Sequence, residues 1–369
     1  MAKTIGLVNL HSEVSYKGLT ENRPVASVSY LGRYGIIDFV LSNMSNSNLD
    51  AVGILIQSNP RSLFKHLGTG NEWNFNLKKG GISLLYNEQY ANNLKYNHDI
   101  NNLVENIAFI RDNAPDYVVI APAHIITTMD YEEVVDAHIE SGAEITVVYQ
   151  HINNADESFI GSDYLRLNGN KVDEIKVNKG NKKERDISLE TYVINASVLF
   201  ELIDYATHLS SFYGLRDTLS YLADERTINA YEYKGYVRCI DSMEHYLEYS
   251  LEMLDLDVST QVFKSNWPIY TRTNDTPPTK YKKHARVTKS FVANGAIIDG
   301  KVEGSIIGRG VEIGKGAVVK NSIIFSGSKI AEGAVLENVI VDKRVSVEKV
   351  TELTGTKTNP LYIKEGDVI

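Results

Sequence analysis

The chain has 369 residues, of which 43% are hydrophobic and 23% charged, and this length is enough for two domains rather than one. The net charge of -9 argues against a protein that binds nucleic acid through electrostatics, and the single cysteine, Cys239, excludes an internal disulfide and a cysteine-based zinc site. The first residues do not form a signal peptide and no apolar run has membrane-spanning length, so we expect a cytoplasmic protein with neither membrane nor nucleic acid as partner.

Strand and helix patterns alternate over residues 1–255. Short apolar runs predict buried strands at residues 5–10, 52–56, 117–121 and 145–149. Helix-length segments lie between them, for example at residues 101–111 and 131–141. This alternation predicts an α/β domain with a doubly wound, mostly parallel sheet, whose ligands bind at the carboxyl ends of the strands.

The alternation stops at residue 256. Residues 256–286 include the polar stretch NDTPPTKYKKH with Pro277 and Pro278, which is typical of an extended linker or arm.

A period of six residues begins near residue 287. Ile307, Ile313 and Val319 are six apart, and so are the second set, Ile324, Ile330 and Leu336. One inward aliphatic residue per hexad, with glycines at the turns, predicts a left-handed parallel β-helix over residues 287–369, with about four or five coils. A β-sandwich with glycine-rich turns is the alternative, but a sandwich gives no reason for a period of six.

Several segments resemble glucose-1-phosphate adenylyltransferase, the ADP-glucose pyrophosphorylase of glycogen synthesis. The most specific is YLGRYGIIDFVLSNMSNSNLD, where that family has GGxYRIIDFxLSNCxNSG. The resemblance extends from end to end, through SLFKHLGTGNEWN, MDYEEVVDAHIESGAEITV and GYVRCIDSMEHYLEYSLEML to the hexad repeat. It implies a nucleotidyltransferase-like domain followed by a β-helix.

The family's phosphate-binding loop, LAGGxGxRLxPLT, aligns with VNLHSEVSYKGLT at residues 8–20. Its glycines fall on Leu10, His11 and Glu13, and its arginine falls on Ser15. Backbone N–H groups approach a triphosphate closely only where side chains are absent. The altered loop is therefore expected not to hold ATP as the family does.

Other positions that the resemblance assigns to the chemistry have also changed. The phosphate-contacting lysine of RAKPAVP falls on Val25, and the nucleotide-side GTADA run falls on His98–Asn102. The two aspartates that hold Mg²⁺ in the active family fall on Ala123 and Cys239. Magnesium requires hard oxygen ligands, so we expect no Mg²⁺ cofactor and no catalytic, cofactor-binding or metal-binding residue.

Remnants of two binding sites are expected. On the sugar-phosphate side, Lys179 and Ser188 match the lysine and serine of the family that the chain resembles, although Glu190 stands where the family has a glycine. Arg23 and Arg33 are candidates for binding an anionic effector, with plain surface solvation as the alternative.

The chain keeps the pattern of the whole fold but has lost key residues of the motifs. In this combination it resembles the D-type subunit that accompanies a catalytic C-type subunit in some bacteria. The resemblance implies a non-catalytic partner that joins a catalytic glucose-1-phosphate adenylyltransferase subunit, as a heterotetramer or, when isolated, as a homo-oligomer. Two alternatives remain: an active enzyme with altered site residues, and a hexad-repeat acyltransferase. Residues 287–369 contain no histidine, which the acyltransferase class usually needs there.

Overall fold

The computed structural model describes residues 2–12, 14–16, 18–75, 81–93, 95–210, 213–223, 225–349 and 351–369. The chain divides into two compact units. Unit 1 comprises Met1–Glu13, Phe39–Cys239 and Trp267–Tyr270, and unit 2 comprises Val14–Asp38, Ile240–Asn266 and Thr271–Ile369. No helix among the described residues is long and apolar enough to cross a membrane.

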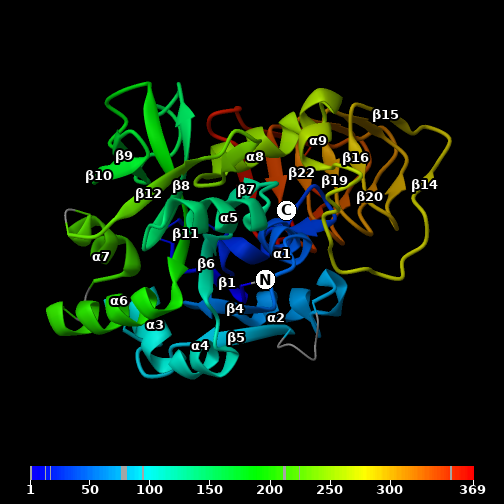
Figure 1. The fold of residues 1–369 in the computed structure, drawn as a ribbon. Helices are drawn as coiled ribbons and strands as arrows, with labels where there is room; N and C mark the ends of the chain where they lie inside the picture. Colours follow the sequence, from blue (N-terminus) through cyan, green and yellow to red (C-terminus); the bar gives the residue numbers. More distant parts are fainter. Residues whose placement is uncertain are drawn as a thin grey trace. The chain divides into compact units, whose positions relative to one another are not determined.

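In the described part of unit 1, a nine-stranded sheet forms the centre (Figure 1). Its strands, in spatial order, are β5 (Gly81–Tyr86), β4 (Ala51–Ile56), β1 (Thr4–Asn9), β6 (Tyr117–Pro122), β11 (Arg185–Asn195), β8 (Ile145–Ile152), β12 (Ile228–Glu232), β10 (Lys171–Val177) and β9 (Asp163–Asn168). The four predicted strands correspond to β1, β4, β6 and β8. The run β5-β4-β1-β6 is parallel, as is the pair β8-β12, whereas β11 is antiparallel to both β6 and β8. The predicted α/β class is confirmed, with a mixed rather than purely parallel sheet.

Helices follow the strands in the alternation that the sequence predicts. Before β12, the described helices are α1 (Ile37–Asn46), α2 (Arg61–Leu67), α3 (Asp99–Glu105), α4 (Ile107–Asn113), α5 (Tyr131–Ser141), α6 (Ala196–Leu209) and α7 (Leu215–Leu222). Helix α5 has the predicted bounds, because Asp130 caps its first turn and Gly142 ends it with φ 64°. The single helix predicted over residues 101–111 is wrong, since Asn106 separates α3 from α4.

One apolar core joins the sheet of unit 1 to its helices. Ile5 of β1 and Val118 of β6 lie in the same buried cluster as Leu103 of α3, Leu199 of α6 and Leu219 of α7. This core packs the helices against the sheet and so supports the loops that follow the strands.

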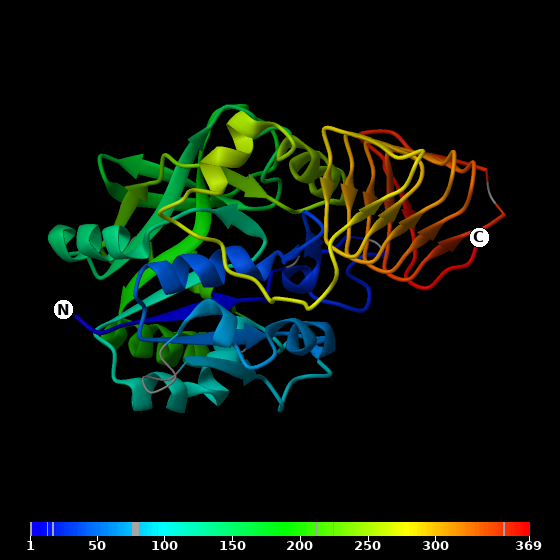
Figure 2. The same ribbon diagram turned by 90° about the vertical axis from the view of Figure 1, so that its right-hand side faces the viewer.

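The C-terminal part of unit 2 is a left-handed β-helix, seen as stacked coils coloured yellow to red in Figure 2. Over the described residues it has five coils and three parallel sheets. The first sheet contains β14 (Lys280–Tyr281), β17 (Ile297–Ile298), β20 (Glu312–Ile313), β23 (Lys329–Ile330) and β26 (Ser346–Val347). The second contains β15 (Arg286–Thr288), β18 (Lys301–Glu303), β21 (Val318–Lys320), β24 (Val335–Glu337) and β27 (Glu352–Thr354). The third contains β16 (Phe291–Val292), β19 (Ile306–Ile307), β22 (Ile323–Ile324), β25 (Val339–Val341) and β28 (Leu361–Ile363).

The hexad register is confirmed. Ile307, Ile313 and Val319 are 0%, 2% and 0% exposed and belong to one apolar cluster inside the coils. The coils from Ile306 to Ile340 nevertheless take 17 residues each rather than three full hexads, as the pairs Ile306–Ile323 and Ile323–Ile340 show. One corner is therefore a residue shorter than the other two.

The rest of unit 2 contains the short hairpin β2 (Ser29–Tyr30) and β3 (Tyr34–Gly35), and the helices α8 (Met243–Glu252) and α9 (Leu256–Val262). The boundaries of the two compact units differ from the domain boundaries that were expected at residues 255 and 287. The segment expected as a linker begins with α9, and β14 at its other end already pairs in the first coil.

Candidate functional site

A buried network of polar side chains follows β1. Asn9 donates from Nδ2 to Oδ2 of Asp99 at 2.8 Å, and its Oδ1 accepts the backbone N–H of His11 at 3.0 Å. The ring of His11 points into the same network, with Nδ1 3.3 Å from the carbonyl oxygen of Asn97 and Nε2 3.0 Å from Nδ2 of Asn102. A packed side chain therefore stands where the family's loop has glycine.

The network keeps His11 uncharged. Burial lowers the pKa of His11 from 6.5 to about 4, although the charge of Asp99 opposes this shift. In the neutral ring Nδ1 donates to the Asn97 carbonyl and Nε2 accepts from Asn102, so both nitrogens are engaged. Such a ring supplies neither a positive charge nor a free donor to a phosphate. Leu10 is also buried, and Glu13 lies outside the described residues.

Residues 98–102, where the resemblance places the nucleotide-side run, form the start of α3 and hold neighbouring elements together. Asp99 Oδ1 accepts backbone N–H groups from Ile100 at 2.8 Å and from Leu215 at 2.9 Å. The side chain of Asn102 is fully buried and donates to the carbonyls of Ile56 and Leu85, each at 3.2 Å. The side chains of Asp99 and Asn102 therefore serve to hydrogen-bond neighbouring segments of unit 1 to one another.

The structure places Ala123 and Cys239, the two positions that the resemblance assigns to the magnesium aspartates, on neighbouring segments. Strand β7 (Ile125–Thr127) pairs with β13 (Val237–Cys239), so that Cys239 lies opposite Ile125, two residues after Ala123. Ala123 and Cys239 are 3% and 1% exposed. Alanine has no donor atom and a thiol is a soft one, so this pair does not fit a magnesium ion. The described residues contain no cluster of three His, Cys, Asp or Glu side chains suited to a metal.

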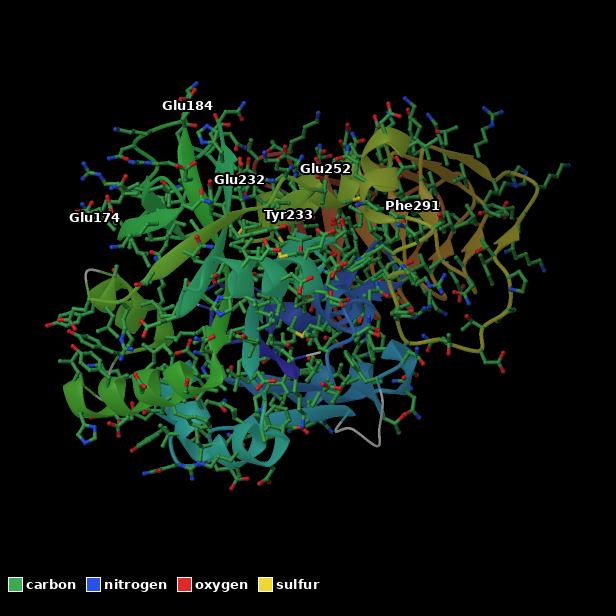
Figure 3. All side chains as sticks on the ribbon, in the orientation of Figure 1. Glu174, Glu184, Glu232, Tyr233, Glu252 and Phe291 are labelled. Atoms are coloured by element: carbon green, nitrogen blue, oxygen red, sulfur yellow. The ribbon has the colours of Figure 1, made fainter. Side chains whose placement is uncertain are left out.

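The two residues expected on the sugar-phosphate side lie in different surroundings. Lys179 is exposed in the loop after β10, and in the sequence it lies between Glu174 and Glu184, which Figure 3 labels. Ser188 is 1% exposed within β11, and its Oγ accepts the backbone N–H of Glu190 at 3.2 Å. No hydrogen bond or ion pair joins Lys179 to Ser188 among the described residues. Ser188 is therefore part of the strand packing in this conformation.

Glu190, where the resemblance has a glycine, adopts a backbone conformation that favours glycine. It has φ 50° in an irregular stretch of β11, where the pairing with β8 shifts between Ser188 and Thr191. A non-glycine residue in this left-handed region costs about 1–2 kcal/mol. Its carboxylate Oε2 lies 3.8 Å from Nε2 of the buried His124. A negative charge at this bend is unfavourable for a sugar phosphate.

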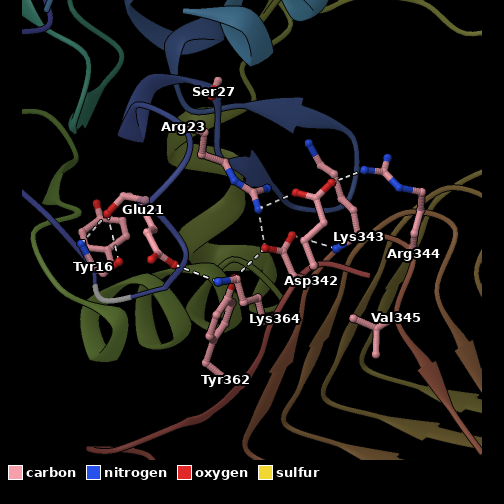
Figure 4. Close-up of polar contacts among 12 residues, drawn as sticks. Tyr16, Glu21, Arg23, Ser27, Asp342, Lys343, Arg344, Val345, Tyr362 and Lys364 are labelled. Carbon is pink, nitrogen blue, oxygen red and sulfur yellow. Dashed lines mark hydrogen bonds and ion pairs between the residues drawn. The ribbon is translucent and has the colours of Figure 1, made fainter. Parts of the chain in front are cut away.

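Arg23, an expected effector residue, lies in a buried ion-pair cluster of unit 2 (Figure 4). Its Nη2 contacts Oδ2 of Asp342 and lies 3.0 Å from Oε2 of Glu365. The hydroxyl of Tyr362 donates to the same oxygen of Asp342 at 2.6 Å. With the Arg23 and Asp342 side chains 6% and 0% exposed, the pair ties residues 14–38 to the last coils of the β-helix. Breaking a buried pair of this kind by removing one partner typically costs about 3–5 kcal/mol.

Arg33, the other expected effector residue, is exposed and lines a cavity of about 500 Å³ in unit 2. Arg309 of the β-helix lines the same cavity. Sequence reasoning did not single out Arg309, which is far from Arg33 along the chain. The available signal was its place at a corner of the hexad pattern, between Gly308 and Gly310, where a side chain points away from the core.

Comparisons with known proteins cover both halves of the chain. Residues 17–211 match the family model described as nucleotidyl transferase, and residues 277–358 match the GlmU-like C-terminal hexapeptide model. The glycogen biosynthesis protein GlgD of Bacillus subtilis (strain 168) is 33% identical, over 98% of this chain and 96% of that protein. GlgD of Geobacillus stearothermophilus is 34% identical, over 99% and 97%. The glucose-1-phosphate adenylyltransferase of Geobacillus stearothermophilus is 32% identical, over 82% and 79%. The chain therefore belongs to the nucleotidyltransferase family that contains the GlgD proteins and the glucose-1-phosphate adenylyltransferases.

Proposed function

We propose that this chain is a non-catalytic partner subunit of a glucose-1-phosphate adenylyltransferase in glycogen synthesis, and that it acts in the cytoplasm. Relatives similar over nearly its whole length are glycogen biosynthesis proteins named GlgD, and others are glucose-1-phosphate adenylyltransferases. The chain resembles these relatives over most of its length, and we infer that it lacks the side chains of the reaction.

The observation that carries this proposal is the network around His11. Nucleotidyl transfer depends on donors and cations placed around the phosphates. Here a neutral, hydrogen-bonded ring replaces the loop glycine, and Val25, 7% exposed, replaces the phosphate-contacting lysine. Loss of one transition-state contact commonly lowers the rate about a hundredfold or more. Several such contacts are missing together.

A non-catalytic chain acts through its partner. If it binds one conformation of the catalytic subunit better than another, it shifts the population of that subunit. We therefore expect it to assemble with the catalytic relative, as a heterotetramer, and to change the relative's apparent substrate affinity or effector response.

The test is an ADP-glucose assay of three samples: the isolated chain, the catalytic relative and their mixture, with native mass measurement of the mixture. We expect no turnover by the isolated chain, a mixed complex, and altered kinetics of the relative. A fourth sample combines the chain with an inactivated variant of the relative, so that any turnover belongs to this chain. Turnover comparable to the relative's in the first or fourth sample favours the active-enzyme alternative and contradicts the proposal. Unchanged kinetics and no complex in the mixture contradict the partner role.

A further inference from the structure

We infer that a pair of tyrosines on α6 and α7 binds the chains of a neutral polysaccharide of α-linked glucose. The pair consists of Tyr205 and Tyr221, whose ring centroids are 6.3 Å apart and whose planes are inclined by 38°. In unit 1, α6 and α7 pack against each other, α6 also against β6 and β11, and α7 against β10 (Figure 1). The ring of Tyr221 is 55% exposed, so the tyrosine pair is open to a ligand from the solvent.

Further apolar side chains are exposed along α6 and at its end. Leu209 follows Tyr205 by one turn on the same face of α6 and is 41% exposed. Tyr213 comes directly after α6, where its backbone N–H donates to the carbonyl of Ser210 at 3.3 Å, and it is 38% exposed. Scattered single apolar residues are ordinary on a protein surface, but a group of neighbouring ones marks an interaction site.

The tyrosine pair is held in place before a ligand binds. Tyr205 packs against the apolar core of unit 1. Leu219 and Leu222, on either side of Tyr221 in α7, are 1% and 3% exposed and so fix the direction in which Tyr221 points. Because a tyrosine side chain has only two torsions to restrict, such rings give a large contact area at a low cost in conformational entropy.

Carboxylates surround the tyrosine pair. Glu201 lies one turn before Tyr205 and pairs with Arg226 at 2.7 Å. Burial, and then the neighbouring Tyr221 and the charge of Glu225, raise the pKa of Tyr205, so its hydroxyl stays protonated. The surroundings of the pair therefore repel phosphate, nucleic acid and anionic lipid, and they offer acceptors to the hydroxyl groups of a neutral ligand.

A sugar chain has the chemistry that this surface requires. A glucose ring presents C–H groups on its faces, which aromatic rings can cover, and hydroxyl groups around its edge, which carboxylates and tyrosine hydroxyls can bind. The inclination between the two rings fits the curved chain that α-linkages produce better than the flat ribbon that β-linkages produce. The choice of glucose as the sugar rests on the proposed role in glycogen synthesis, whereas the neutral polyhydroxyl class rests on the tyrosine pair and its carboxylates.

The experiment measures binding of maltohexaose to the full isolated chain by calorimetry, and migration of the chain in native gels with and without glycogen. We expect binding of maltohexaose, weaker binding of the β-linked cellohexaose, and slower migration in the glycogen gel. Tyr221→Ala and Tyr205→Ala should each weaken the affinity about threefold or more, while Tyr221→Phe should keep most of it because the ring remains. Tyr281→Ala in β14 of unit 2 is the matched control and should change nothing, since Tyr281 is 56% exposed, nearly the same as Tyr221.

No binding of maltohexaose, or unchanged affinity in both alanine variants, overturns the inference. Equal affinities for maltohexaose and cellohexaose overturn the assignment of α-linked chains. An oligomer that Tyr221→Ala dissociates, in a chain that binds no maltohexaose, would show that a second copy covers the tyrosine pair instead. If Tyr205→Ala unfolds, the test remains with the exposed Tyr221. Because binding is measured without the catalytic relative and without ADP-glucose synthesis, its failure is distinguishable from a failure of the partner-subunit proposal.

Discussion

His11 is one of the positions at which this chain departs from the motif of the family that it resembles. His11 stands at a position where bare backbone would face phosphate, and it is held by Asn97 and Asn102 rather than by solvent. The ring can occupy this place only while it is neutral, because a buried imidazolium would lose its hydration without gaining a carboxylate partner in direct contact. The replacement therefore makes folding depend on pH.

We expect acid to destabilise the protein through His11. Its pKa in the folded state, about 4, lies below the 6.5 of the unfolded chain, so the unfolded state binds more protons between these values. Stability is complete above pH 6.5 and falls as the pH decreases towards 4. Urea unfolding at pH 7.5 and pH 5 should show a loss of about 2 kcal/mol in the wild type relative to His11→Asn. Equal losses in both proteins contradict this account, and the exposed His208→Asn serves as the control.

At the scale of elements, the β-helix depends on stacked aliphatic residues. Ile313 lies between Ile298 and Ile330 in neighbouring coils and is 2% exposed. The shorter third corner is made possible by Asn321, which adopts φ 44°, a conformation that asparagine tolerates better than most residues. The geometry of each coil therefore depends both on its buried aliphatic residues and on the backbone conformation at its corners.

Truncation inside one coil should weaken the whole β-helix. Ile313→Ala removes apolar contacts to two coils and should destabilise unit 2 by about 2–5 kcal/mol in urea unfolding. The neighbouring Glu312→Ala is the matched control, since Glu312 is exposed and its ion pair is with the exposed Lys329, at 3.4 Å. A loss below about 0.5 kcal/mol is expected there. Similar effects of the two substitutions would show that the inward register does not determine stability.

At the scale of the whole molecule, the positions where the resemblance places the reacting side chains are spread over segments that are far apart in the sequence. Val25, Ala123 and Cys239 are all buried, so a charge introduced at any one of them is also costly to the fold. If this chain is non-catalytic, as we propose, the missing groups all concern one transition state, and restoring one of them should restore little.

We expect Ala123→Asp alone to give no ADP-glucose synthesis and to lower the thermal unfolding temperature. Detectable turnover should require Val25→Lys, Ala123→Asp, Cys239→Asp and a rebuilt glycine loop together. The measurement is product formation by each single variant and by the combined variant, with Cys239→Ser as the control without an added charge. A single substitution that gives the relative's rate would show that the other positions do not limit the chemistry.

The sequence by itself determined the two architectures, because each has a period that depends on nearby residues: strand–helix alternation in the first half and six-residue spacing in the second. It also showed that alanine stands at residue 123, where the resemblance places a magnesium ligand, and an alanine side chain offers no ligand in any fold. It could not predict the break at Asn106 or the antiparallel β11, which depend on packing against distant elements. Only the tertiary structure showed that Arg23 is neutralised inside unit 2, whereas Arg33 shares a cavity with Arg309. Whether a charged side chain is paired or open depends on residues that the chain brings close only when it folds.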